Sequence, residues 1–179
     1  MRGLEEVSSL ISDIYDAALD PTLWVGVLEN SERFVGGPAA SLFWKDAASK
    51  SGDVVYDCGI EPYYRQLYFE KYAKLDPLTI GHFFAEVEEA VAVADIMSYD
   101  EFLETRAYRE WGRPQGLIDV LNVALDKTAT SAAMFCVFRH ERDGRVDDEM
   151  RRRMRLVTPH MRRSVLIGRV IDLRTAEAA

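Results

Sequence analysis

LIDVLNVAL, residues 117–125, and SAAMFCVFRH, residues 131–140, are the two stretches that decide the fold. Both are mainly apolar runs rich in leucine, valine and phenylalanine, a composition typical of buried strands. The residues between them, 126–130, have the composition of a turn. Strands joined so closely pair antiparallel. The sequence therefore predicts a β-hairpin made of Leu117 to Leu125 and Ser131 to His140.

A second hairpin is predicted nearer the N-terminus. Ala39 to Trp44 and Val54 to Cys58 are strand-like, and the segment Lys45 to Asp53 between them is a polar turn. Ala90 to Ile96 adds a further strand, although it contains fewer β-branched residues than the others. Because hairpins dominate, we expect a mainly antiparallel five-stranded sheet.

The chain opens with two predicted helices. The first is amphipathic over residues 4–18 and stops at Asp20-Pro21. The second has Pro21 in its first turn, runs through Leu23 and Phe34, and ends at Gly36-Gly37, where a left-handed cap is sterically cheap. Both precede the first strand, so a helical pair is expected to pack on the sheet.

Two more helices are predicted between the hairpins. One runs from Pro62 to Lys74 and is ended by Asp76-Pro77, because the residue before a proline avoids helical angles. The other runs from Tyr99 to about Trp111, and Ser98 with Glu101 three positions later forms a capping box at its start.

The C-terminal segment is predicted to be a long helix over residues 147–175, with Asp147 as its N-cap. Pro159 should kink this helix or break it in two. An apolar stripe follows one face at helical spacing: Met150, Met154, Val157, Met161, Val165 and Ile171. Residues 1–179 are thus expected to form a single α+β domain, an α-β-α sandwich with the sheet between helices.

The composition fits one globular domain of 179 residues, with 48% hydrophobic and 29% charged residues. The longest apolar runs are far shorter than the roughly 18 residues of a membrane span. The N-terminus has no apolar signal segment, so we expect a cytoplasmic protein that does not contact a membrane. The net charge is −8. An acidic body repels nucleic acid, so the chain by itself is not expected to bind DNA.

The sequence contains no catalytic or metal-binding motif. It lacks a GxSxG nucleophile motif, an HExxH motif and a phosphate-binding loop. Its three histidines, His82, His140 and His160, are far apart, and each is expected on the surface or in a loop. Cys58 and Cys136 lie in apolar stretches without CxxC spacing, which favours buried reduced thiols. We expect no enzymatic activity, no metal site and no cofactor.

Three tyrosines, at positions 64, 68 and 72, repeat every four residues on the predicted helix Pro62 to Lys74. Such a stripe either packs into the core or lines a pocket. Three hydroxyls on one face favour a half-polar cavity, because buried tyrosine hydroxyls need partners and a ligand could supply them. We therefore predict a ligand-sized cavity between this helix and the sheet. Its predicted lining is Tyr64, Tyr68, Tyr72, Phe43 and Tyr56.

Three segments resemble the ligand-binding domains of LuxR-family transcription regulators. EPYYRQLY, residues 61–68, with Tyr72 and Asp76-Pro77-Leu78, looks like the aromatic helix and Asp-Pro turn of those domains. WGRPQGLID, residues 111–119, resembles the segment in which they leave a helix and enter the sheet. TPHMRR, residues 158–163, is similar to the closing helix of related helix-turn-helix regulators with a PAS- or GAF-like N-terminal domain. The resemblance spans nearly the whole chain and implies a PAS/GAF-like fold.

The resemblance also implies a sensor domain that binds a small, partly apolar effector. In the acyl-homoserine-lactone receptors of the family, the aromatic helix and the Asp of the turn contact the ligand head, which implies Tyr64, Tyr68 and Asp76 here. Asp76 is also expected to cap its turn by accepting backbone N–H groups. Those receptors carry Trp where Tyr64 lies and Gly where Val120 lies, so the resemblance does not specify a lactone. After Arg174 only Thr-Ala-Glu-Ala-Ala remains, so the DNA-binding helix-turn-helix is expected outside this chain.

Other interpretations stay open: a haem-binding PAS or GAF module with one of the histidines as axial ligand, a dimerisation module without a ligand, and a free-standing ligand carrier. A homodimer is expected. The helix Asp147 to Arg174 would span roughly 40 Å, about twice a typical strand. The overhang needs a partner, and a symmetric copy is the commonest one. We expect the first helix and the C-terminal helix to form the contact.

Overall fold

A computed structural model describes residues 2–46, 48 and 51–178. Its centre is a five-stranded sheet with the strand order β2-β1-β5-β4-β3, in which each strand is antiparallel to its neighbours. Both predicted hairpins are present, and the predicted α+β class with a five-stranded antiparallel sheet is confirmed. The strands are β1 (Ala39–Asp46), β2 (Ser51–Cys58), β3 (Ala90–Val91), β4 (Leu117–Lys127) and β5 (Ser131–His140).

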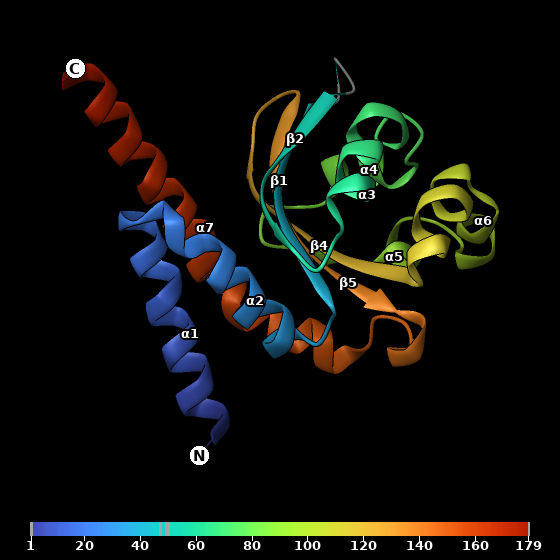
Figure 1. Ribbon diagram of the computed structural model, residues 1–179, viewed down its shortest axis with the longest axis horizontal. Coiled ribbons are helices and arrows are strands. Elements are labelled where there is room, and N and C mark those ends of the chain that lie inside the picture. The colour runs from blue at the N-terminus through green and yellow to red at the C-terminus, as the bar shows by residue number, and fades with distance from the viewer. Residues whose placement is uncertain (1, 47, 49–50, 179) are drawn as a thin grey trace.

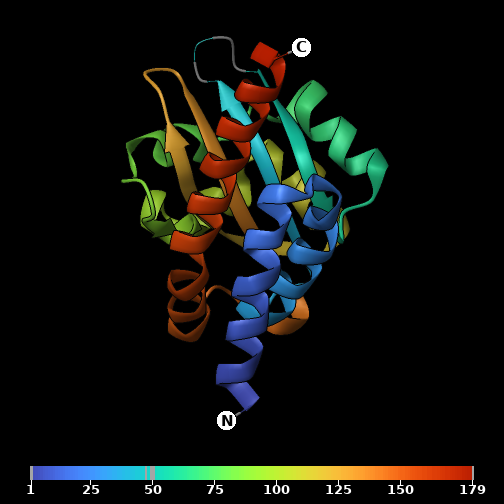
Figure 2. The ribbon, with the colours of Figure 1, turned by 90° about the vertical axis from the view of Figure 1, so that its left-hand side faces the viewer.

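Helices cover both faces of the sheet (Figure 1). One face carries α1 (Arg2–Leu19), α2 (Trp24–Val35) and α7 (Asp148–Ala178), and Figure 2 looks onto this layer. The other face carries α3 (Pro62–Leu67), α4 (Leu78–Phe84), α5 (Val93–Ile96) and α6 (Tyr99–Glu104). Shorter turns complete the chain: π-helical turns at Tyr68–Tyr72 and Tyr108–Gly112, and 3-10 turns at Pro21–Leu23, Arg113–Gln115 and Glu141–Asp143. In the described part of the chain, none of the helices is long and apolar enough to cross a membrane.

The hairpin β4–β5 is apolar on both faces, and helices cover each face. Leu121 and Val123 belong to the core under α1, α2 and α7, whereas Val120 and Ala124 belong to the core under α4 to α6. This alternation is the two-residue period of a strand. A polar side chain on the second face of β4 or β5 is consequently enclosed between the sheet and the shorter helices.

The expected strand Ala90 to Ile96 is wrong for most of its length. Pairing with β4 ends at Val91, and Val93–Ile96 is the short helix α5. The carboxylate of Asp95 accepts the backbone N–H of Ala92 at 2.7 Å. This contact satisfies a donor at the helix start, which favours a helix over continued strand.

The predicted helix Tyr99 to Trp111 is interrupted at Thr105. The backbone of Thr105 is extended, and its hydroxyl accepts the N–H of Tyr108 at 3.2 Å. Thr105 thus ends α6 and caps the following π-helical turn. Ser98 precedes α6, but its side chain makes no capping hydrogen bond, so the predicted capping box is wrong.

The long C-terminal helix begins as predicted, since Asp147 Oδ1 accepts the N–H of Met150 at 2.8 Å. It is not broken at Pro159, which lies inside α7. An internal proline costs about 3 kcal/mol. Val157, Thr158 and Met161 are buried on both sides of Pro159, so packing on the sheet holds the two halves of the helix together.

Candidate functional site

A cavity of about 90 Å³ lies between the sheet and the layer that contains α3, α4 and α6, where the sequence predicted one. Roughly 10–15 Å³ of such space admits one water molecule, so the cavity can hold several waters or a small organic molecule. Its walls are dominated by aromatic rings: Phe43, Phe69, Phe102, Tyr108, Trp111 and Phe138. Sites for small molecules are typically apolar hollows of this kind with a few placed polar groups.

Lys45 brings an ammonium group into the cavity. Ser41, Phe43 and Lys45 occupy every second position of β1, and all three line the cavity. The Lys45 Nζ contacts the Tyr68 hydroxyl at 2.5 Å and the Thr79 hydroxyl at 2.9 Å. It also pairs with the Asp76 carboxylate at 3.3 Å. An ammonium group has three hydrogens to donate, so each hydrogen of this almost fully buried group has a partner.

Asp76 connects the Asp-Pro turn to this cluster. Its Oδ1 accepts the N–H of Leu78 at 2.9 Å, which is the predicted turn cap, and its Oδ2 accepts the Tyr68 hydroxyl at 2.5 Å. Burial raises the pKa of the Asp76 carboxyl, but the Lys45 ammonium and the hydrogen bonds outweigh burial and bring the pKa below its ordinary value. Burial and the Asp76 charge raise the pKa of Tyr68. The cluster is therefore a carboxylate, an ammonium and a protonated phenol.

His82 and Asn122 form a second polar group on the cavity wall, on α4 and β4. Both side chains are buried, and His82 Nε2 lies 3.2 Å from Asn122 Nδ2. Burial and then the nearby Lys45 charge lower the pKa of His82 to about 3, so its ring is neutral at pH 7. His82 Nδ1 and Asn122 Oδ1 have no hydrogen-bond partner in the structure as described. Buried polar atoms are seldom left unpaired, but these two atoms have almost no accessible surface, so they are enclosed behind the cavity wall and do not face the cavity.

Three of the predicted site residues, Phe43, Tyr68 and Asp76, line the cavity. Their contact with an effector stays a prediction. The position of Tyr68 follows from α3 continuing into the π-helical turn Tyr68–Tyr72, which directs the ring toward Trp111, with centroids 5.1 Å apart.

The other three predicted residues do not line the cavity. Tyr64 and Tyr72 pack in a cluster with Trp111 and Tyr68 at the edge of the cavity but do not line it, and Tyr72 donates to Glu110 at 2.7 Å. Tyr56 lies on the opposite face of the sheet, stacked on Trp24 with ring centroids 6.1 Å apart. In the register of the Phe43–Val54 pair, Tyr56 would face Ser41 on the cavity side, but a bulge after Leu42 pairs Tyr56 with Leu42, and cross-strand partners share a face.

Sequence reasoning missed seven polar residues of the cavity wall: Ser41, Lys45, Asp57, Arg65, His82, Asp119 and Asn122. His82 is buried and lies on α4, so its expected place on the surface or in a loop is wrong. Asp119 and Asn122 carried a usable signal, because they interrupt an apolar strand that is covered on both faces. Lys45 was assigned to the predicted turn Lys45 to Asp53, where a lysine is typically exposed.

The cavity does not fit haem. Of the three histidines, His82 lines the cavity, but about 90 Å³ is far too small for the macrocycle, and His82 Nε2 is already held by Asn122. Among the residues described, no group of three or more His, Cys, Asp or Glu side chains could hold a metal ion. Cys58 and Cys136 are free thiols, Cys136 buried and Cys58 half-buried.

No protein-family model matches the sequence, and no curated protein matches it significantly. Solved structures do match. The LBD domain of VqsR from Pseudomonas aeruginosa superposes with a TM-score of 0.72 at 13% identity, over 90% of this chain and 94% of that chain. CepR2 from Burkholderia cenocepacia, an N-acylhomoserine-lactone-dependent LuxR-family transcription factor, gives a TM-score of 0.67 at 10% identity, over 94% of this chain and 98% of that chain.

GAF domains match as well. The phycoerythrobilin-bound GAF domain of a cyanobacterial phytochrome gives a TM-score of 0.61 at 8% identity, over 96% of this chain and 98% of that chain. At such identities the similarity shows the fold alone. The fold is therefore GAF-like and shared with LuxR-type ligand domains, as the sequence resemblance implied.

Proposed function

We propose that this chain is the ligand-sensing domain of a bacterial LuxR-type transcription regulator. It binds a small, partly apolar effector and transmits binding to a helix-turn-helix segment outside this chain, which makes the contact with DNA. The observation that carries the proposal is the aromatic-walled cavity with Lys45, Tyr68 and Asp76 at its polar end. The shared fold supports it, because similar structures include named ligand domains.

Binding without catalysis agrees with the protonation states in the cavity. Burial raises the pKa of the Cys136 thiol to about 12 and lowers the pKa of His82 to about 3. A nucleophilic cysteine needs a lowered pKa, and a general base works best with a pKa near the working pH. Both side chains are shifted the opposite way, so at pH 7 they are a neutral thiol and a very weak base.

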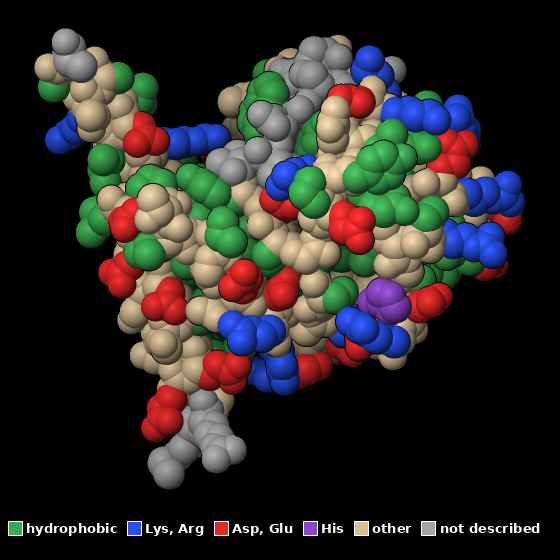
Figure 3. Space-filling view, viewed as in Figure 1, with side chains coloured by type: hydrophobic (Ala, Val, Ile, Leu, Met, Phe, Trp, Pro, Cys, Tyr) green, Lys and Arg blue, Asp and Glu red, His purple; other side chains and the backbone are tan. Residues whose placement is uncertain are grey.

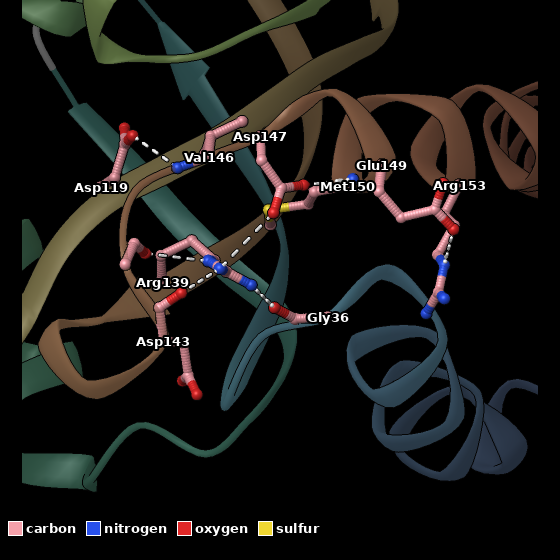
Figure 4. Close-up of polar contacts among 10 residues, drawn as sticks. Gly36, Asp119, Arg139, Asp143, Val146, Asp147, Glu149, Met150 and Arg153 are labelled. Carbon is pink, nitrogen blue, oxygen red and sulfur yellow. Dashed lines mark hydrogen bonds and ion pairs between the residues drawn. The ribbon is translucent and has the colours of Figure 1, made fainter.

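The hydrogen bonds of Asp119 connect the cavity wall to the start of α7. Its side chain lines the cavity and accepts the N–H groups of Val120 at 2.9 Å and Val93 at 3.3 Å. Its other oxygen accepts the N–H of Val146 at 3.0 Å, one residue before the N-cap Asp147 (Figure 4). A ligand that displaces Asp119 would release or shift the start of α7.

Arg139 holds the same region from the end of β5. Its guanidinium donates to the carbonyls of Gly36 at 2.6 Å, Gly144 at 3.0 Å and Asp143, and it lies 3.9 Å from the Asp147 carboxylate (Figure 4). The start of α7 is therefore fixed to the sheet and to the end of α2. Movement there would be carried along α7 as a rigid element toward the output segment.

We also propose that two copies of the chain form a homodimer. Helix-turn-helix regulators read paired half-sites, so a sensor can control them by setting the spacing of two output segments. The C-terminal part of α7 carries exposed apolar side chains at Ile167, Val170 and Ile171. Such side chains suit a contact between two copies of the helix.

The test is to identify what the cavity holds. The chain is expressed in bacteria and purified, and mass spectrometry is applied to the material released on denaturation. We expect a small molecule from the wild type and none from Ala107→Phe, which fills the cavity wall. Ala176→Phe, at an exposed position of α7, is the matched control. Equal release from wild type and Ala107→Phe would contradict the proposal, and so would failure of every small molecule tested to bind the wild type.

A further inference from the structure

Acidic and basic side chains are segregated between α1 and α7, which lie side by side on one face of the sheet (Figure 2). From residue 3 to residue 19, α1 contains acidic residues but no lysine or arginine: Glu5, Glu6, Asp13 and Asp16. From residue 150 to residue 171, α7 contains arginines but no acidic residue: Arg151, Arg152, Arg153, Arg155, Arg162, Arg163 and Arg169. The layer therefore presents an acidic helix beside a basic one.

The two helices run parallel to each other. The Ser164 hydroxyl donates to the carbonyl of Ile14, 150 positions earlier in the chain, and Gly168 lies next to the carbonyl of Ala18. Both contacts have the same offset, so the residues of α1 and α7 advance together along the layer. With this offset Glu5 lies near the level of Arg155, and Asp16 lies within one helical turn of the level of Arg163.

These charges have no partner within the chain. Glu5 and Asp16 on α1 and Arg155 and Arg163 on α7 are exposed. Among the residues that the structure describes, none of these side chains takes part in an ion pair, and no ion pair joins α1 to α7. The buried side chains of both helices face the sheet, so the unpaired charges face outward, where a second copy of the chain can meet them.

A twofold axis can join two such layers face to face in two ways. When the axis runs along the helices, α1 of one copy faces α7 of the other. When the axis crosses the helices in the plane of the layer, α1 faces α1 and α7 faces α7, each pair antiparallel. The first arrangement places acid against base, whereas the second places like charges together, which is unfavourable across an interface.

From this charge segregation we infer that the homodimer is parallel, with α1 of each copy packed on α7 of the other. Glu5 of one copy pairs with Arg155 of its partner, and Asp16 pairs with Arg163 in the same way. The inference rests on the proposed homodimer and specifies its orientation and its contacts.

A parallel dimer also places the two output segments together. Both α7 helices then end on the same side of the dimer, as two segments that read neighbouring half-sites require. Past the end of α1 at Leu19, the two α7 helices can meet directly through the exposed Val170 and Ile171.

Two chains with reversed charges test the inferred contacts by sedimentation at low ionic strength. One carries Glu5→Arg with Asp16→Arg, and the other carries Arg155→Glu with Arg163→Glu. In either chain alone, like charges face each other across the parallel dimer, so we expect self-association at least about tenfold weaker than in the wild type. An equimolar mixture restores every opposite-charge pair, so a heterodimer should form with an affinity within about threefold of the wild type. Native mass spectrometry distinguishes this heterodimer from the two homodimers.

Three controls accompany these chains. The chain that carries all four changes has the charges of α1 and α7 exchanged, and it should dimerise like the wild type. Glu70→Arg with Glu101→Arg adds the same charge on the opposite side of the sheet and should leave dimerisation unchanged. At about 1 M salt the difference between reversed and wild-type chains should shrink, because salt screens exposed charges. Circular dichroism checks that each variant is folded.

The outcomes separate the orientation from the dimer itself. If the wild type dimerises, and the folded reversed chains dimerise as tightly or their mixture forms no excess of heterodimer, the parallel arrangement is overturned while the homodimer stands. If the four-change chain is monomeric although folded, the inferred pairs are also overturned. A wild type that sediments as one chain would overturn the homodimer together with this inference, whereas ligand binding by the cavity would be unaffected.

Discussion

Lys45 and Asp76 are a buried ion pair on which the stability of the cavity depends. Lys45→Met leaves the Asp76 carboxylate without its cation, and breaking a buried pair in this way typically costs about 3–5 kcal/mol. Asp76→Asn added to Lys45→Met removes the stranded charge and keeps an oxygen for the N–H of Leu78. We expect urea denaturation to show a large loss for Lys45→Met and partial recovery in the double variant. A double variant as unstable as the single one would show that charge pairing is not the cause.

His82 makes stability depend on pH in the weakly acidic range. Burial lowers its pKa to about 3 in the folded chain, against 6.5 as the ordinary value. Between these values the unfolded chain binds more protons, so the free energy of unfolding rises with pH. The contribution is complete above about pH 6.5 and is lost as the pH falls toward 3. Between pH 6.5 and 4.5 we expect a loss of roughly 2–3 kcal/mol from this group.

The measurement is urea denaturation of wild type and His82→Gln across that pH range, with a shallower slope expected in the variant. His160 has a pKa that partial burial also lowers, which gives the same sign, so His160→Gln is measured in parallel as a control. Asp76, with a lowered pKa, loses its contribution only below about pH 4. Equal slopes in wild type and His82→Gln would contradict the assignment.

At the scale of elements, the link between the cavity and α7 depends on both oxygens of Asp119. Asp119→Asn keeps one acceptor and loses the other, so at least one of three N–H groups, two buried and one part-buried, loses its partner, at about 1–3 kcal/mol. We expect hydrogen exchange at the Val146 amide to become at least tenfold faster, while exchange at Leu28 in α2 follows only the change in global stability. If Val146 and Leu28 respond equally, the contact does not hold the start of α7 separately.

The hairpins could be predicted from the sequence because strand pairing there follows local apolar runs and turns, as in β4 and β5. The misassigned elements depend on side-chain contacts that no periodicity reports. Asp95 starts α5, Thr105 ends α6, and packing on both sides of Pro159 keeps α7 continuous. A local pattern cannot show such contacts until the partners are placed.

The location of the candidate site and part of its lining could also be predicted from the sequence. Its location and Phe43, Tyr68 and Asp76 follow from the aromatic helix and the Asp-Pro turn. Lys45 lies two positions after Phe43 on β1, so the two-residue period of the strand places both side chains on the cavity face. The predicted strand ended at Trp44 and assigned Lys45 to the turn, whereas β1 continues to Asp46. Lys45 was missed because a lysine in a turn is normally exposed.

At the scale of the whole molecule, two groups of exposed apolar side chains are candidates for association (Figure 3). The C-terminal group is Ile167, Val170, Ile171 and Leu173 on α7, and the helical-layer group is Tyr63, Ile80 and Phe84 on α3 and α4. The buried positions of α7 end at Ser164, whose hydroxyl donates to the carbonyl of Ile14 in α1 at 2.6 Å. Beyond that point α7 projects from the body (Figure 1).

We expect the C-terminal group to form the dimer contact. Ile167, Val170 and Ile171 fall at three- and four-residue spacing, which gives one continuous apolar face suited to a second helix. Ile167→Glu with Val170→Glu places charges on that face, whereas Phe84→Asp makes a similar change in the helical-layer group. Sedimentation at micromolar concentration should give about twice the chain mass of 20.3 kDa for the wild type and for Phe84→Asp. The double glutamate variant should sediment as the single chain. A wild type that sediments as one chain, or dissociation caused by Phe84→Asp alone, would rule out α7 as the contact.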